Sequence, residues 1–448
     1  MSKKAFRLIL VLVAIVATLA APTVFAQDDD MMELPELTGE GIECPEGEAE
    51  ISFAGGAVGA EREIARQAAD VFESFCENVT IDILEMPDSA TERLNIYLQT
   101  FEAQSPDIDV MQVDVIWPAI IAPHVVPVSD FLTEEEIGEF FTDMIQGQTV
   151  DGTLVAIPFF SDAAGLYYRT DLLDKYGLDV PTTWEEITEA SAIIQEGEQA
   201  EGNEEFTGYV WQGNDYEGLT CDAHEWLVST TGDSFITADG EVNVTDEAFA
   251  AVVAEAANEW VGGISPEGVT TYQEEDSRNV FQSGNAAFMR NWPYAFNLGN
   301  ADDSPIAGNF DWVPLPSGGE RVAACLGGWQ IAVSSYSDNV DAAAAFAKYL
   351  TSFEQQRNRA LVQGQLPSRP AVYEDELVAS DALFEAAGPI LATAFPRPSV
   401  ITGDRYAEAS AIFSGGIHDI LTGEIGVEEG LAELEAALLD FVAAGEEE

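Results

Sequence analysis

The chain has 448 residues and a formal net charge of −64 at pH 7. Such an acidic surface repels nucleic acid and anionic membranes, which excludes both as expected partners, and its self-repulsion favours a salty habitat. An apolar content of 47%, with eight tryptophans and 24 phenylalanines, excludes a disordered acidic tail. It predicts packed cores in a chain long enough for two domains.

Residues 1–26 have the pattern of a secretory signal peptide. Lys3, Lys4 and Arg7 precede an apolar run over residues 8–21, and a small-residue cleavage site ends at Ala26. We therefore expect an exported protein, periplasmic or extracellular, at the outer face of the cytoplasmic membrane. Because no cysteine follows the site, a lipid anchor is not expected, whereas an uncleaved N-terminal anchor stays open.

The first α/β unit follows an acidic segment. Residues 27–48 are rich in proline and glycine, which predicts a flexible leader. Residues 50–54 then form a buried strand, a glycine turn follows, and residues 61–75 have a helical pattern. A ligand-facing loop is expected at the carboxyl end of that strand. The glycine spacing matches neither a dinucleotide loop nor a phosphate loop.

Strands and helices alternate along the rest of the chain, which predicts the α/β fold class. Further strands are predicted over residues 79–84, 108–113, 206–212, 286–289, 310–315 and 323–333, and residues 154–169 form two strands that flank Asp162. Helices are predicted over residues 90–101, 133–141, 171–176, 183–195, 225–229, 246–260, 341–351, 354–363, 381–393 and 427–444.

Residues 281–296 (FQSGNAAFMRNWPYAF) combine two large aromatic rings with an arginine and a carboxamide. That mixture suits a sugar, because a pyranose offers C–H groups to a ring and hydroxyls to planar polar groups. The alternative is a buried strand that turns into a helix at Pro293, with Trp292 in the core. Asp114 and Trp117 after the strand at 108–113 also indicate a cleft, although Trp117 equally suits packing.

Four cysteines in an exported chain predict two disulfides, with three possible pairings. The preferred pairings are Cys44 with Cys76, which ties the leader to the end of the first helix, and Cys221 with Cys325, which closes a long loop. No Cys-x-x-Cys pair exists and only three histidines are available, so neither a metal nor a cofactor is expected.

Six segments carry a resemblance to a known family: DVMQVDVIWPA, DGTLVAIPFFSDAAGLYYRTDLLDKYG, GYVWQGNDYEGLTCDAHEW, VFQSGNAAFMRNWPYAF, AACLGGWQIAVSSYSDN and AFPRP. From about residue 50 onward the chain resembles the extracellular sugar-binding proteins of ABC importers, the maltose-binding-like group, and within it the trehalose/maltose receptors. The resemblance implies two α/β lobes joined by a hinge, with the sugar between them. It implies lobe 1 from residues 49–160 and 327–367, and lobe 2 from residues 161–326 and 368–445.

The resemblance also implies the residues that hold the sugar. Carboxylates accept hydrogen bonds from hydroxyls, arginines donate in a planar fork, tryptophans stack, and a glycine pair lets the backbone approach. For each residue type the alternative is structural: a solvated carboxylate, an ion-paired arginine or a packed ring. Position 160, often a hydroxyl-bearing aromatic in relatives, is Phe160 here, which removes one hydrogen bond. The implied residues are Glu61, Arg93, Asp114, Asp162, Trp292, Gly327, Gly328, Trp329 and Arg397, with Tyr216 and Glu217 in a neighbouring motif.

The implied function is binding without chemistry. A monomer would capture an α-linked disaccharide, such as trehalose or maltose, and deliver it to the permease subunits of an ABC transporter. The main alternative is a secreted glycoside hydrolase acting on α-glucosides, which also needs tryptophan platforms and paired carboxylates. A structural or adhesive surface protein is disfavoured by the lack of repeats, and a nucleophilic triad by the lack of a histidine motif.

Overall fold

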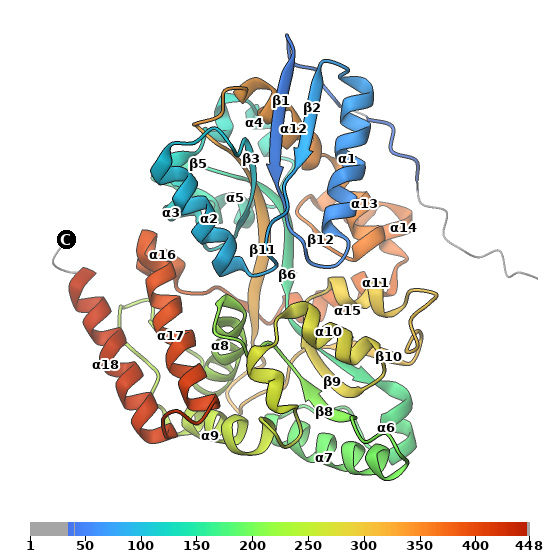
Figure 1. Ribbon diagram of the computed structural model, residues 1–448, viewed down its shortest axis with the longest axis vertical. Helices are drawn as coiled ribbons and strands as arrows, with labels where there is room; N and C mark the ends of the chain where they lie inside the picture. The colour runs from blue at the N-terminus through green and yellow to red at the C-terminus, as the bar shows by residue number, and fades with distance from the viewer. Residues whose placement is uncertain (1–34, 40, 446–448) are drawn as a thin grey trace, which may run out of the picture. The chain divides into compact units, whose positions relative to one another are not determined.

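The computed structural model describes residues 35–39 and 41–445. The predicted signal peptide and residues 27–34 of the predicted leader lie outside the described residues. The remainder of the chain builds two β-sheets and a small hairpin, with helices packed around them (Figure 1).

The larger sheet runs in the order β12-β6-β11-β3-β1-β2, and β13 pairs with β11. β1 is parallel to β2 and β3, whereas β11 is antiparallel to β3 and β6. The strands are β1 (Ala49–Ala54), β2 (Val79–Ile83), β3 (Val110–Asp114), β6 (Ile157–Ala163), β11 (Ala324–Val333), β12 (Leu366–Pro367) and β13 (Ala394–Phe395).

The smaller sheet runs in the order β10-β7-β9-β8. β7 is antiparallel to both neighbours, and β8 is parallel to β9. The hairpin of β4 and β5 turns at Asp151 and Gly152, whose positive φ angles of 48° and 80° suit a tight turn between twisted strands. The strands are β4 (Thr149–Val150), β5 (Thr153–Leu154), β7 (Gly165–Arg169), β8 (Thr207–Val210), β9 (Ala286–Asn291) and β10 (Phe310–Val313).

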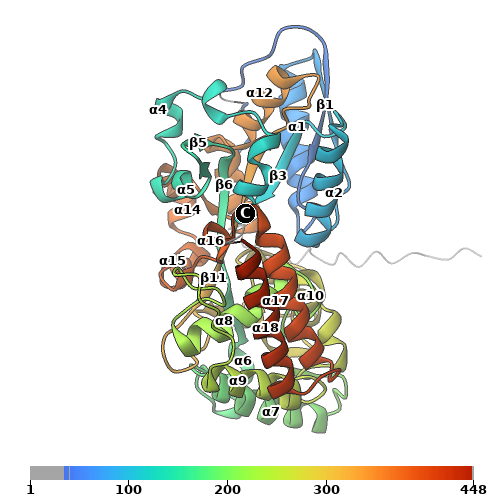
Figure 2. The same ribbon diagram turned by 90° about the vertical axis from the view of Figure 1, so that its left-hand side faces the viewer.

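Helices cover both sheets (Figures 1 and 2). The longer ones are α1 (Glu61–Phe75), α2 (Ala90–Ala103), α7 (Trp184–Ala200), α8 (Glu217–Thr231), α9 (Glu247–Glu255), α10 (Glu274–Gln282), α12 (Val340–Leu350), α13 (Phe353–Gln363), α15 (Ala382–Leu391), α17 (Tyr406–Leu421) and α18 (Val427–Gly445). The shorter ones are α3 (Pro118–Ile121), α4 (Glu134–Ile137), α5 (Thr142–Gly147), α6 (Thr170–Tyr176), α11 (Tyr294–Gly299), α14 (Glu376–Ala379) and α16 (Ser399–Thr402).

Each sheet has its own hydrophobic core. Both faces of the larger sheet are buried, because successive strand side chains point to opposite faces: Val110 packs in one cluster, and Met111 and Val113 pack in another. A third cluster surrounds the smaller sheet and includes Phe288 and Trp260. The two sheets therefore belong to separately packed parts of the molecule.

Two strands connect these parts. β6 leaves the larger sheet at Ala163 and continues through Ala164 into β7 of the smaller sheet. β11 pairs with β6 over most of its length, with an irregularity between Trp329 and Gln330. Figure 1 shows β6 and β11 side by side in the larger sheet, where they extend toward the smaller one.

The elements differ from the predicted ones at a few places. Asp162 lies inside β6, and the break between the two predicted strands falls at Ala164. α10 was not predicted, because it is strongly polar and buries only Ser277 and Phe281. α17 was not predicted either, since adjacent glycines usually end a helix. Here Gly416 packs against Leu434 of α18, where a Cβ would come within 3.0 Å.

The described part of the leader contacts the rest of the chain through hydrogen bonds and a disulfide. The backbone N–H groups of Thr38 and Gly39 donate to the buried carboxylate of Glu354, at 2.6 and 3.1 Å. Further along, the predicted disulfide between Cys44 and Cys76 is present. It joins the leader to the residue after α1.

The second predicted disulfide is wrong. Cys221 of α8 and Cys325 of β11 are free thiols, and both are buried. They share an apolar cluster with Val228, Ala323 and Phe395, so the core uses them as small apolar side chains. The pairing was inferred from the number of cysteines, and number alone does not distinguish a bridge from a packed thiol.

Among the helices of residues 35–39 and 41–445, none is both long and apolar enough to cross a bilayer. The same residues contain no group of three or more His, Cys, Asp or Glu side chains that is arranged to hold a metal ion.

Candidate functional site

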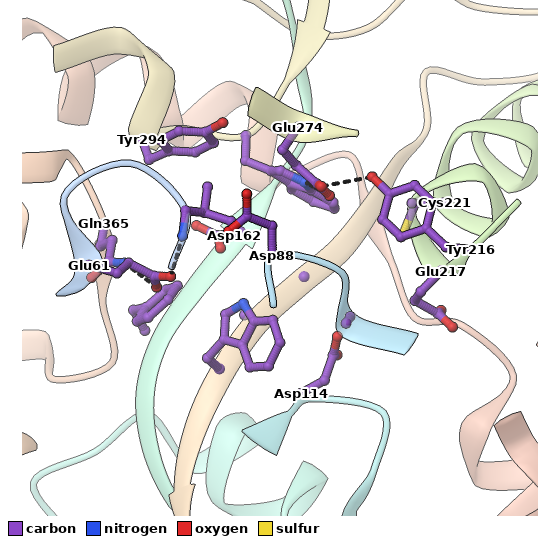
Figure 3. A pocket seen from close by; sticks show the side chains of 18 of the residues that line it. Glu61, Asp88, Asp114, Asp162, Tyr216, Glu217, Cys221, Glu274, Tyr294 and Gln365 are labelled. Carbon is purple, nitrogen blue, oxygen red and sulfur yellow. Dashed lines mark hydrogen bonds between the residues drawn. The ribbon is translucent and has the colours of Figure 1, made fainter. Parts of the chain in front are cut away.

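One pocket gathers ten of the eleven sequence-predicted site residues (Figure 3). It lies beside the two connecting strands, and its lining comes from elements on both sheets. The predicted residues in its lining are Glu61, Asp114, Asp162, Tyr216, Glu217, Trp292, Gly327, Gly328, Trp329 and Arg397.

Three of the four predicted acidic residues reach the pocket from the ends of helices or strands. Glu61 and Glu217 are the first residues of α1 and α8, where the positive end of a helix dipole favours a carboxylate. Asp114 is the last residue of β3, and the carboxyl end of a strand is the expected place for a ligand contact in an α/β sheet. Asp162 comes from within β6.

Each tryptophan of the pocket rests on a buried arginine. The guanidinium carbon of Arg290 lies 4.2 Å from the ring centroid of Trp292, and that of Arg93 lies 4.3 Å from the ring centroid of Trp329. Arg93 is 0% exposed and does not line the pocket. Its predicted direct contact with the ligand is therefore not what the structure shows, because the Trp329 ring covers it.

The stretch that suggested a sugar site reaches the pocket through its rings alone. Arg290 is buried and donates to both carboxylate oxygens of Glu225, at 3.0 and 2.7 Å. The side chain of Asn291 is also buried and donates to the backbone carbonyl of Glu274. Trp292 and Tyr294 line the pocket, whereas Arg290 and Asn291 are buried behind the lining residues.

Arg397 joins acidic groups from the two predicted lobes. Its Nη2 donates to Oδ1 of Asp114 at 3.1 Å, and its Nη1 donates to Oε1 of Glu217 at 2.7 Å. Glu217 also accepts hydrogen bonds from Tyr406 at 2.5 Å and from Ser410 at 2.6 Å. Both oxygens of Glu217 are thus occupied, so its role is to hold Arg397 beside Asp114.

Asp162 is a lining carboxylate that the described residues leave without a hydrogen-bond donor. It is 9% exposed, and no donor in the described part of the chain bonds to its carboxylate. Burial, together with the charges of Glu61 and Asp114, raises the pKa of Asp162 well above its usual value. Burial also raises the pKa of Asp114, although Arg397 opposes that shift. A ligand that donates hydrogen bonds would relieve this cost.

The glycine pair is required by the protein itself. A Cβ on Gly327 would lie 2.9 Å from the ring of Trp292, and Gly328 has a φ of +127° with the carbonyl oxygen of Phe160 only 2.6 Å from the Cβ position. The pair was predicted to make room for a ligand, and the structure shows that it makes room for Trp292 and β6. Phe160 lines the pocket without a hydroxyl.

Trp117 belongs to the core. It is 2% exposed and packs edge-on against Trp329, with ring centroids 5.6 Å apart. Of its two predicted roles, packing is therefore the one that the structure shows.

Several lining residues were not predicted. Tyr294 lies inside the aromatic stretch and was within reach of the sequence argument. Glu274 is the first residue of α10, the polar helix that was not predicted. Its carboxylate accepts a hydrogen bond from Tyr216 at 2.7 Å. The remaining unpredicted residues are Val58, Asp88, Ala90, Gly218, Cys221, Gln363 and Gln365.

Comparison with known proteins decides the family. Residues 56–357 match the family described as bacterial extracellular solute-binding protein. The chain belongs to this solute-binding protein family. A probable ABC transporter-binding protein of Deinococcus radiodurans is 39% identical over 398 residues, which are 88% of this chain and 94% of that protein.

Solved structures agree with this assignment. Maltose-bound MalE3 of T. maritima superposes with a TM-score of 0.81 at 38% identity, over 87% of this chain and 99% of that one. A solute-binding protein of Thermotoga lettingae bound to α-D-tagatose gives a TM-score of 0.77 at 21% identity, over 88% and 100% of the two chains, which is a likeness of fold alone.

These matches confirm the predicted family and the predicted two-lobed α/β fold. They also decide between the predicted functions, because the relatives and the fold are those of substrate-binding proteins. The solute-binding protein is therefore not an enzyme, and the glycoside hydrolase alternative is set aside.

Proposed function

We propose that the protein is the substrate-binding component of an ABC importer and that it captures an α-linked disaccharide of the maltose or trehalose kind. The observation that carries this proposal is one pocket lined by two tryptophans, each backed by a buried arginine, and by the open carboxylate of Asp162. The rings suit the C–H faces of a pyranose, and the carboxylates suit its hydroxyls. Maltose bound to a relative of 38% identity supports the ligand class.

The geometry supports the following ligand contacts. Trp292 and Trp329 provide stacking surfaces, Asp162 and Glu61 accept hydrogen bonds from hydroxyls, and Arg397 orients Asp114. Gly327 and Gly328 allow Trp292 to approach the strand. Tyr216 and Glu217 act through Glu274 and Arg397 respectively.

The lobes that close on the ligand are residues 49–160 with 327–367, and residues 161–326 with 368–445. The continuity of β6 with β7 supports a boundary close to Asp162. A disaccharide shifts the open–closed equilibrium because only the closed form completes the contacts of both lobes. The closed monomer then meets the permease outside the membrane, where an exported chain would reside.

Calorimetric titration of the mature chain tests this function. We would titrate maltose, trehalose, sucrose and glucose at low and high salt, and check the recovered sugar for cleavage. The expected result is one-to-one binding of an intact disaccharide. It should weaken about thirtyfold in Trp292→Ala, a loss of about 2 kcal/mol, and much less in Trp292→Phe, which keeps a ring.

Two other outcomes would contradict the proposal. Recovery of cleaved sugar would support the alternative function, a secreted glycoside hydrolase. A folded protein that binds none of these sugars would show that the ligand belongs to another class, without touching the family assignment.

A further inference from the structure

The carboxylate of Glu61 is held by two glutamines. Its Oε1 accepts a hydrogen bond from Nε2 of Gln112 at 3.1 Å and another from Nε2 of Gln365 at 3.0 Å. Its Oε2 accepts only a long bond from the backbone N–H of Val58, at 3.3 Å. Gln365 and Glu61 both line the pocket and lie side by side in Figure 3. One oxygen of Glu61 is therefore saturated by the protein, and the other has acceptor capacity left.

The chemistry of their neighbours fixes both glutamine side chains. Oε1 of Gln365 faces Nη1 of Arg359 at 3.3 Å, and Oε1 of Gln112 faces the backbone N–H of Gly56 at 2.8 Å. A guanidinium and a backbone N–H can only donate, so each amide must present its oxygen to them and its NH₂ to Glu61. Neither amide can flip without losing both bonds.

The same end of α13 also holds the loop before Glu61. Gln363 donates through Nε2 to the carbonyl of Val58 at 3.1 Å and accepts from the N–H of Ala60 at 3.1 Å. Gly56 approaches so closely that a Cβ there would lie 1.7 Å from Oε2 of Glu61. The β1–α1 loop is thus fastened to residues 363–365, about three hundred positions away in the chain.

Gln365 also lies next to β6, one of the two strands that connect the two parts of the molecule. It directly precedes β12, which pairs with Phe160 and Ser161 of β6. The amide that holds Glu61 is therefore attached to the strands that carry Phe160 and Asp162, two other lining residues.

We propose that Gln365, oriented by Arg359, is a positioning residue that fixes the Glu61 carboxylate for hydrogen bonding to the ligand. This inference rests on the proposed sugar-binding function. Gln365 acts through Glu61: it occupies Oε1, so Oε2 is the oxygen that is presented to a hydroxyl. Neither Gln365 nor Arg359 is among the ligand contacts proposed above.

Substitution Gln365→Glu gives a readout that a merely structural role would not move. When protonated, the new carboxyl donates to Glu61 as the amide did. When ionised, it stands about 3 Å from a second carboxylate and the donor is lost. The charged groups that contact this position are Glu61 on α1 and Arg359 on α13, and Asp162 on β6 interacts in turn with Glu61.

We expect maltose affinity in Gln365→Glu to fall, relative to wild type, by about tenfold to a hundredfold between pH 5 and pH 8. The matched control is Gln195→Glu on α7. There too both amide atoms are bonded, to Gly208 and Gly263, and the residue does not line the pocket. The control should follow wild type at every pH. A Gln365→Glu to wild-type ratio that does not change with pH would overturn the proposal.

A double-mutant cycle separates positioning from direct contact. Gln365→Met should weaken maltose binding in the wild-type background and add nothing in a Glu61→Ala background. Tryptophan fluorescence follows these titrations into the millimolar range, and a thermal melt of each variant reports whether it folds. Additive losses would show that Gln365 contacts the sugar itself and would overturn the positioning role. Failure of wild type to bind any sugar would instead refute the proposed function.

Discussion

The guanidinium of Arg93 lies 4.3 Å from the ring centroid of Trp329, and none of its surface is exposed. Arg290 has the same relationship with Trp292 on the other sheet, at 4.2 Å. A cation behind an aromatic face is worth about 1 to 2 kcal/mol when it is desolvated. Both rings are therefore supported by a buried cation that does not itself line the pocket.

Arg93→Met should weaken maltose binding although Arg93 does not line the pocket. Without the cation, Trp329 loses its support and we expect an affinity about threefold to tenfold lower. Arg62→Met is the matched control, because Arg62 lies on α1 with 43% of its side chain exposed and makes only a surface ion pair with Glu85. Calorimetry measures both. Unchanged affinity in a variant with a lowered melting temperature would make Arg93 a purely structural residue.

Asp162→Asn should stabilise the unliganded protein and weaken its binding. Because burial raises the native pKa of Asp162 above the unfolded value of about 4, the native state binds this proton more tightly. Its contribution to stability is fully present below about pH 4 and is lost as the pH rises through the native pKa.

We therefore expect the free energy of unfolding of Asp162→Asn to be about 0.5 to 2 kcal/mol higher than that of wild type at pH 7. Near pH 3 the two proteins should have the same free energy of unfolding. Urea unfolding at the two pH values measures this difference, and a sugar titration measures the lost acceptor. A variant less stable than wild type at pH 7 would show that the carboxylate has a partner within the protein.

Removal of the single disulfide should affect stability and leave binding intact. Cys44 and Cys76 enclose a loop with a sequence separation of 32, for which the chain-entropy estimate is about 3 to 4 kcal/mol. The Cys44→Ser/Cys76→Ser variant should lose about that much free energy of unfolding, and reduced wild type should match it. Maltose affinity should not change, because neither residue lines the pocket.

The remaining cysteines should react only after unfolding. Cys221 and Cys325 are buried free thiols, so native protein should give almost no reaction with a thiol reagent. Denatured, non-reduced protein should release two thiols per chain. A count of zero after denaturation would mean that these two cysteines are bonded to each other in solution.

The fold was predictable wherever local pattern determines structure. The buried strand and helix at the start, β1 and α1, follow from hydrophobic periodicity. α10 and α17 were missed for opposite reasons: α10 has too few apolar residues for a visible period, and the glycines of α17 are tolerated only because α18 packs against them.

The lining of the pocket was predictable where a motif carries it. Ten residues followed from motif matches, whereas the partners that orient them did not. Gln365 donates a hydrogen bond to Glu61, which is 304 positions away in the chain. No local sequence pattern in either segment predicts this pair. Arg93 shows the converse: the motif predicted a ligand contact, and only the packing of Trp329 against the guanidinium shows that Arg93 lies behind the ring.

Five lining residues, Phe160, Asp162, Gly327, Gly328 and Trp329, sit on β6 and β11, the two strands that run between the sheets. In the proposed function these two strands carry ligand contacts and also link the two lobes. On that proposal, a substitution on β6 or β11 that admits a new sugar would also change how fast the sugar is released to a transporter.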